Sequence, residues 1–288
     1  MLALRPGVVG AIFRKELRSF LGNPTGYVFL TLFIGTTAAA AFLDEGFFAR
    51  NLADLATLNR VMPAILMFFV PAITMNSWAE EQKTGTDELL LTQPVHDGEV
   101  VLGKYLGAMG IYTVGLLFSL ANVVVLAYLG DPDRGLMFAT YLGYWLMGAL
   151  FVAVGMLGSV FTSNATVAFI LGAVGCAGLV FAGSEPWASG LVGVVLIASF
   201  ASLAWLVVAG GARGASVGWL IGAVAALLLW FMPENADGFT RLFDHLSAPE
   251  HFASFGEGII RLGDVCFFLG GAAIALYVCG LMISRRHW

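Results

Sequence analysis

Charged side chains are concentrated from Trp78 to Lys104, between long apolar stretches that carry none. Within this segment, Gly98 to Lys104 reads G-x-x-x-x-G-K and matches most of a phosphate-binding loop. The next residue is Tyr105, not the Ser or Thr that would hold magnesium, and no strand precedes the motif. No nucleophile elbow, zinc-protease helix or paired catalytic acid motif occurs in the sequence. We therefore expect no enzyme, and no cofactor bound by this chain.

The composition indicates a membrane protein. Hydrophobic residues make up 59% of the 288 residues and charged residues 11%, with a mean hydropathy of +0.87. Soluble proteins carry roughly 25% charged residues. Apolar runs of about 20 residues can cross a bilayer core of about 30 Å as helices. We expect an all-α, polytopic integral membrane protein with about eight transmembrane helices, at 27–43, 61–76, 105–129, 136–161, 166–183, 190–209, 215–232 and 265–283.

The predicted spans have no Asp, Glu, Lys, Arg or His near their middles. Proton- or ion-coupled carriers usually place such groups at the midplane, so an ion-driven carrier is disfavoured and the energy should arrive from outside the spans. The three cysteines show no paired spacing, and His245 and His251 have no clear companion ligands. Neither a disulfide framework nor a metal site is expected.

The distribution of Lys and Arg predicts that both termini are cytoplasmic. The cytoplasmic side then holds more of these residues than the outer side, and no basic patch indicates nucleic acid. The two sets are Arg5, Arg14, Lys15, Arg18, Lys83, Lys104, Arg213, Arg285 and Arg286, against Arg50, Arg60, Arg134, Arg241 and Arg261.

Residues 8–21 have the pattern of an amphipathic helix lying at the membrane interface. Apolar residues, Phe13 among them, form one stripe, whereas Arg14, Lys15 and Arg18 lie toward the opposite side, with Glu16 nearby. The alternative is an ordinary basic flank that only sets the topology.

The loop 77–104 is predicted to fold into two short helices on the cytoplasmic face. Gly85 ends the first, and Thr86 can cap a second whose first turn holds Asp87 and Glu88. Leu89, Leu90 and Leu91 follow, Pro94 limits this helix, and Asp97 can cap the next one. The leucine patch can rest on the protein's own spans or dock a partner, and the spacing alone favours the former.

Glycines recur every four residues at Gly210, Gly214, Gly218 and Gly222, so they share one helix face and let a neighbouring helix approach closely. Further along, 233–264 combines acidic residues with apolar stripes and predicts an amphipathic segment at the outer interface.

Four blocks in order along the chain resemble the ABC-2 type transporter permeases, and most of all the gliding-motility GldF type. The blocks are FRKELRSFLGNPTGYVF (13–29), WAEEQKTGTDELLLTQPVHDGEVVLGKYLG (78–107), VGMLGSVFTSNATVAFI (154–170) and HFASFGEGIIRLGDVCFFL (251–269), with the final SRRHW.

The resemblance implies one permease domain over 1–288 in the bacterial cytoplasmic (inner) membrane. Its partners would be a cytoplasmic ABC ATPase, which binds the ATP and Mg, and a second permease subunit, identical or different. It implies ATPase-coupling helices in the loop, with a smaller contact at Ser163 to Ala165. The coupling residues carried over are Glu80, Glu81, Gly85, Thr86, Asp87, Glu88, Leu89, Leu90 and Pro94.

The chain departs from the usual six-span core of these permeases through an additional transmembrane pair at 189–232. We expect an ATP-driven transporter, in the direction of export. A membrane scaffold that anchors an ATPase or secretion machinery without transporting is the alternative.

Overall fold

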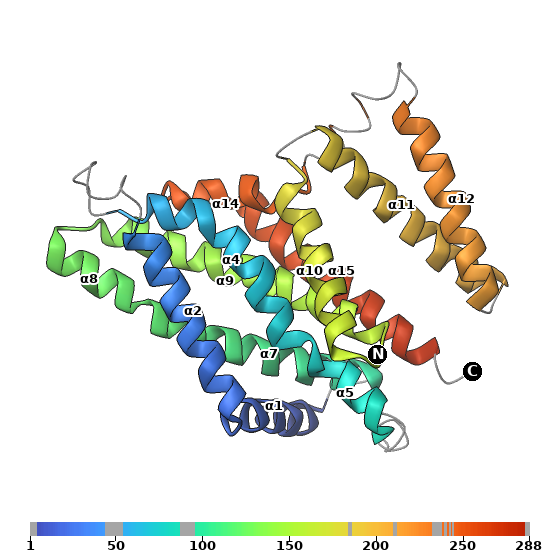
Figure 1. Ribbon diagram of the computed structural model, residues 1–288, viewed down its shortest axis with the longest axis horizontal. Coiled ribbons are helices and arrows are strands. Elements are labelled where there is room, and N and C mark those ends of the chain that lie inside the picture. The colour runs from blue at the N-terminus through green and yellow to red at the C-terminus, as the bar shows by residue number, and fades with distance from the viewer. Residues whose placement is uncertain are drawn as a thin grey trace. The chain divides into compact units, whose positions relative to one another are not determined.

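Helices make up the regular structure of the computed structural model, which describes residues 5–43, 54–86, 96–183, 186–209, 212–231 and 245–285, together with residues 238, 241 and 243 (Figure 1). No strand occurs within these ranges, as the all-α prediction requires. The helices are α1 Pro6–Leu21, α2 Pro24–Phe42, α4 Ala56–Thr74, α5 Asn76–Thr84, α7 Asp97–Ser119, α8 Ala121–Leu129, α9 Arg134–Val160, α10 Ala165–Phe181, α11 Pro186–Ala209, α12 Ala212–Phe231, α14 Ala248–Gly256 and α15 Leu262–Arg285.

The chain forms two compact units. Unit 1 comprises Met1–Cys176 and His251–Trp288, and unit 2 comprises Ala177–Glu250. In unit 1, α9 is the central helix and packs against α4, α7 and α15 (Figure 1). Small residues make this possible: a Cβ on Gly143 would stand 2.6 Å from Cβ of Phe255, and one on Gly148 would stand 2.1 Å from Cε1 of Tyr112. Glycine at these positions lets neighbouring helices approach α9 closely.

Tyrosine hydroxyls satisfy backbone and amide oxygens inside unit 1. Tyr112 donates to the carbonyl of Tyr144 at 2.7 Å, and Tyr144 donates to Oδ1 of Asn59 at 2.5 Å. The hydroxyl of Tyr141 donates to the carbonyl of Ser119 at 2.8 Å, at the break between α7 and α8. These bonds tie α4, α7 and α9 together and pair polar groups within the helix bundle.

Four described segments are long and apolar enough to cross a membrane: Ala56–Thr84, Asp97–Leu129, Arg134–Val160 and Leu262–Ser284. A fifth crossing results if α1 and α2, which bend by 77° at their junction, count as one broken span. Ala165–Phe181, Ser189–Ser199 and Ser216–Trp230 are shorter apolar helical stretches. A multi-pass helical membrane protein is thus supported, whereas the number eight stays a prediction.

Unit 2 is built on the antiparallel pair α11 and α12, with a core that includes Val194, Ala198 and Ala226. A Cβ on Gly218 would meet Cβ of Trp205 at 2.7 Å, and one on Gly222 would meet Ala201, so both glycines face α11. Gly214 also lies within α12, which begins at Ala212.

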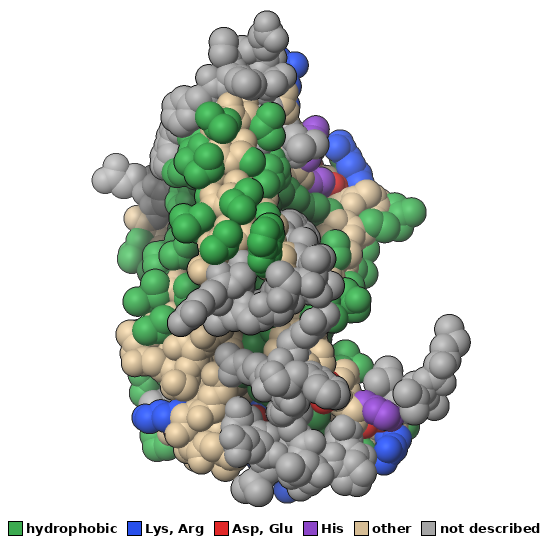
Figure 2. Space-filling model, turned by 90° about the vertical axis from the view of Figure 1, so that its right-hand side faces the viewer, with side chains coloured by type: hydrophobic (Ala, Val, Ile, Leu, Met, Phe, Trp, Pro, Cys, Tyr) green, Lys and Arg blue, Asp and Glu red, His purple; other side chains and the backbone are tan. Residues whose placement is uncertain are grey.

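Large apolar side chains are exposed on the surface of unit 1, among them Tyr27, Leu117, Phe138 and Tyr277. Figure 2, viewed from the side of α11 and α12, shows that hydrophobic side chains are exposed there as well. Such surface is stable in contact with lipid rather than water.

Candidate functional site

Helix α5 continues the chain beyond α4 and carries the first charged residues after the apolar span. It ends at Gly85, whose φ of 68° and ψ of 14° lie in the left-handed region that favours glycine, and whose N–H donates to the carbonyl of Glu81. Thr84 adds a hydroxyl bond to the carbonyl of Glu80 at 2.9 Å. The predicted end of this helix at Gly85 is therefore present.

Helix α5 has a buried face and an exposed face. On the buried face, Trp78 is 2% exposed, and Nε2 of Gln82 donates to the carbonyl of Val160 at the end of α9. On the other face, Glu80, Lys83 and Thr84 are exposed. One face is fixed to the rest of unit 1, and the other is exposed.

A buried lysine connects three helices, of which α5 is one. Nζ of Lys104, in α7, lies 2.6 Å from the carbonyl of Ser77, 2.9 Å from Oε1 of Glu81 and 3.5 Å from Oε1 of Glu16 in α1. Nζ of Lys15 lies 2.9 Å from the same Oε1 of Glu81 and 3.8 Å from Glu16. We call Lys15, Glu16, Glu81 and Lys104 the clamp. Its charges come from α1, α5 and α7, and Figure 1 shows α1 and α5 at the same end of unit 1.

The clamp balances two ammonium groups with two carboxylates. The side chain of Lys104 is only 2% exposed and that of Glu81 14%, so either charge alone would be costly. The ring of Trp78 adds a cation–π contact, 4.8 Å from Nζ of Lys104. Partial burial alone would lower the pKa of Lys15, but its hydrogen bond to Glu81 and the charges of Glu81 and Glu16 outweigh this and raise the pKa. Lys15 therefore stays charged at neutral pH.

Glycines bring α1 and α7 into close contact. A Cβ on Gly103 would stand 2.8 Å from Cβ of Ile12, and one on Gly107 would stand 2.6 Å from Cβ of Glu16. At the start of both helices, the buried carboxylate of Glu99 accepts the backbone N–H of Arg5 at 2.6 Å. Helix α1 is thus attached to α7 at its beginning and along its middle.

The residues predicted for the interfacial helix separate by exposure. Phe13 and Glu16 are half-buried toward α7, whereas Arg14, Lys15 and Arg18 are exposed. The amphipathic pattern of 8–21 is present in the structure, and its position on a membrane surface stays a prediction.

The predicted ATPase-coupling residues have different environments. Glu80, Gly85 and Thr86 are exposed, but Glu81 is held inside by two lysines. Asn164 accepts the N–H of Thr166 at 2.9 Å and caps α10. Outside the described residues lie Asp87, Glu88, Leu89, Leu90, Leu91 and Pro94.

The sequence did not identify Lys104 as a residue that connects helices, and it predicted the start of α7 one residue too late. The N-cap of α7 is His96, whose N–H donates to Glu99 at 3.2 Å, so Asp97 is the first helical residue and not the cap. The available signal was a lysine at the boundary of a long uncharged stretch, flanked by Gly103 and Gly107. Lys104 was interpreted only as the last residue of a segment that resembles a phosphate-binding loop, and in the structure this segment is helical.

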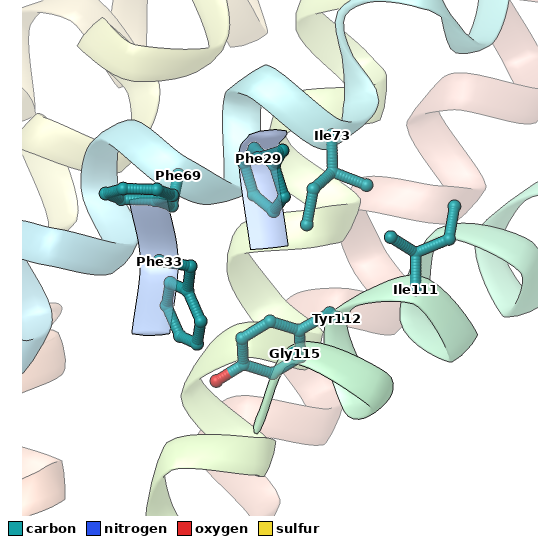
Figure 3. Close-up of a pocket in the computed structure, with 7 residues that line it drawn as sticks. All are labelled: Phe29, Phe33, Phe69, Ile73, Ile111, Tyr112 and Gly115. Carbon is teal, nitrogen blue, oxygen red and sulfur yellow. The ribbon is translucent and has the colours of Figure 1, made fainter. Parts of the chain in front are cut away.

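An apolar pocket lies among α2, α4 and α7 (Figure 3), but it is a packing feature and has no room for a water molecule. Phe69 meets Phe29 and Phe33 edge to face, with ring centroids 5.3 Å apart in both pairs. The hydroxyl of Tyr112 is already bonded to Tyr144. Among the described residues, no group of three His, Cys, Asp or Glu side chains could hold a metal ion.

The fold and the clamp define a class of protein: a polytopic helical membrane protein with a charged junction at one end of its spans. Residues 45–186 match the family described as ABC-2 family transporter protein. This match includes Glu81 and Lys104 but begins after Lys15 and Glu16.

Two curated proteins, each described as a probable ABC transporter permease protein NosY, are similar to this chain. The protein from Stutzerimonas stutzeri is 30% identical over 169 residues, which cover 54% of this chain and 57% of that protein. The protein from Pseudomonas aeruginosa is 30% identical over 158 residues, which cover 51% and 57%. The chain thus spans little more than half the length of these relatives. Over about half of its length, the chain is thus similar to ABC-2 family transporter proteins and to ABC transporter permeases; the gliding-motility subtype stays a prediction.

Proposed function

We propose that this chain is the membrane subunit of an ATP-driven ABC-2 exporter and that a separate cytoplasmic ATPase, which binds ATP and Mg, acts on it through the 77–104 loop. A second permease subunit completes the transport route. The observation that carries the proposal is the two-sided helix α5: its inner face is bonded to α1, α7 and α9, and its outer face presents Glu80 and Lys83.

The orientation follows from charge. Lys83, Lys104 and the basic residues of α1 lie at the end of unit 1 where α5 ends and α7 begins, whereas Arg60, Arg134 and Arg261 lie at the opposite helix ends. The excess of Lys and Arg favours a cytoplasmic location for the α5 end, where an ATPase can reach it. Helix α1 then lies at the cytoplasmic interface, both termini are cytoplasmic, and the chain crosses the membrane eight times, with α11 and α12 as the additional pair.

Reconstitution in nanodiscs with the cognate ABC ATPase tests the proposal. Glu80→Lys is expected to lower ATPase association at least about tenfold, because it reverses a charge on the open face of α5. Glu257→Lys is the matched control: it makes the same change at an exposed position at the opposite end of unit 1 and should leave association unchanged. Equal effects of the two substitutions, or no association of the unmodified chain, would contradict the proposed coupling.

Transport is tested separately from docking. ATP-dependent movement of a substrate across proteoliposomes supports an exporter. An ATPase that binds at α5 but moves no substrate, with native lipids and the second subunit present, would favour the non-transporting scaffold.

A further inference from the structure

Helices α1 and α5 pack mainly against other helices and not against each other. The main contacts of α1 are with α7 and then α2, and those of α5 are with α9 and then α4. The described polar contacts that link the two helices pass through Lys104 and Lys15. A displacement of α5 can therefore reach α1 either directly through these charges or only indirectly through the helix bundle.

We propose that Lys104 is a positioning residue that locks α1 to α5, so that the interfacial helix follows the coupling helix as one rigid body. This inference rests on the proposed function for its purpose, but the lock itself is a property of this chain alone. The side chain of Lys104 is 2% exposed, and it acts through Glu81, Glu16 and the carbonyl of Ser77.

The chemistry of lysine fits this position. An ammonium has three N–H donors and no acceptor. Nζ of Lys104 has three oxygen acceptors within 3.5 Å: the carbonyl of Ser77, Oε1 of Glu81 and Oε1 of Glu16. Two come from α5 and one from α1, so each donor serves a helix other than its own.

Burial makes this link stiff. Lys104 is 2% exposed, so little water can compete for its donors, and its attraction to the carboxylates is weakly screened. Lys15 makes a parallel link to Glu81, but its side chain is 61% exposed. Exposed ion pairs contribute little to stability. The lock is therefore assigned to Lys104, with Lys15 secondary.

The lock is tested by the distance between α1 and α5 in the full chain without any ATPase. Spin labels are placed at Ser19→Cys and Thr84→Cys, both exposed positions, with the exposed Cys266 changed to Ser and the other two cysteines buried. In lipid nanodiscs, the chain with Lys104 intact is expected to give one narrow distance distribution, and its width is the readout.

The perturbing variant removes the charges without stranding any of them. Lys104→Met alone would leave the carboxylates of Glu81 and Glu16 with only the exposed Lys15 as a charged partner and can prevent folding, so the variant combines Lys104→Met, Glu81→Gln and Glu16→Gln. We expect its distance distribution to be at least twice as wide. Lys83→Met, the same substitution at an exposed lysine of α5, is the matched control and should leave the width unchanged. Lys15→Met removes only the parallel link to Glu81 and Glu16 and should widen the distribution less than the triple variant does. An unchanged width in the folded triple variant would overturn the proposal.

The coupling step is measured on the complex with the cognate ATPase. On ATP binding, the Ser19–Thr84 label distance should stay constant in the otherwise native chain and change in the triple variant. A change of that distance in the native chain would refute rigid-body movement. Failure of the ATPase to bind the native chain would refute the proposed function instead, and the measurement on the chain alone would still decide the lock.

Discussion

The contact between α1 and α7 can be tested with one added methyl group. In Gly107→Ala, the new Cβ would stand 2.6 Å from Cβ of Glu16, whereas carbon atoms pack favourably at about 3.5–4.0 Å. The helices must therefore separate locally by about 1 Å, which would also move Glu16 relative to Lys104. Overpacking of this kind costs about 1–3 kcal/mol, and the gain in helix propensity from Gly to Ala is about 0.8–1 kcal/mol.

Gly10→Ala provides the matched control. Gly10 lies inside α1, and a Cβ there would meet nothing within 4 Å, so this variant keeps the propensity gain without the clash. The difference between the two variants isolates the packing cost, at about 1–3 kcal/mol, which corresponds to a factor of about 5–150 in the population of undocked α1.

The assay is maleimide labelling of Ile12→Cys, whose side chain faces Gly103, in a Cys266→Ser background. Gly107→Ala should increase the labelling rate by a factor of about 5–150 relative to Gly10→Ala. If the two variants label at the same rate and melt at the same temperature, the close approach of α1 and α7 is wrong.

Three further substitutions probe the interior. Gly148→Ala would place a methyl group 2.1 Å from Cε1 of Tyr112 and should destabilise unit 1 by about 1–3 kcal/mol, seen as a lower melting temperature. Tyr144→Phe removes the bond to Asn59 and should cost about 1 kcal/mol, with no further loss when Asn59 is already replaced by Ala. Gly222→Val should separate α12 from α11, which it contacts closely, and raise hydrogen exchange in both helices while unit 1 keeps its protection.

The long apolar helices could be predicted from the sequence because each is defined by a local property, hydropathy over one or two dozen residues. The helix end at Gly85 could also be predicted from the sequence, because the left-handed conformation that often ends a helix favours glycine. Break points were harder: the predicted span at 105–129 is interrupted near Leu120, where Tyr141 satisfies a carbonyl from another helix. A bond formed only in the folded bundle leaves no trace in local periodicity.

The clamp was unpredictable for the same reason. Glu16 and Lys104 are separated by 88 positions in the sequence, and their pairing depends on how α1 lies across α7. Glu81 was predicted to be a coupling residue on the strength of a family motif, yet the structure buries it against two lysines. Its neighbour Glu80, predicted alongside it, is the residue that remains exposed. The sequence motif includes both residues, and only the packing of α5 distinguishes the exposed Glu80 from the partly buried Glu81.

The two faces of α5 should therefore respond differently to salt. The Asp97–Leu129 segment has 33 residues, about 50 Å of helix against a bilayer core of about 30 Å, and its uncharged part begins at Tyr105. The excess length thus lies at the end that holds Lys104, inside protein but next to the aqueous boundary. Raising the ionic strength from about 0.05 to about 0.5 M shortens the screening length from more than 10 Å to less than 5 Å.

That change should weaken ATPase association through the exposed Glu80 and Lys83 severalfold, because their charges act through water. The Ser19–Thr84 label distance should not change, because the Lys104 contacts are shielded from the ions. A clamp that loosens at high salt while docking is unaffected would mean that the buried and exposed faces of α5 have been assigned the wrong way round.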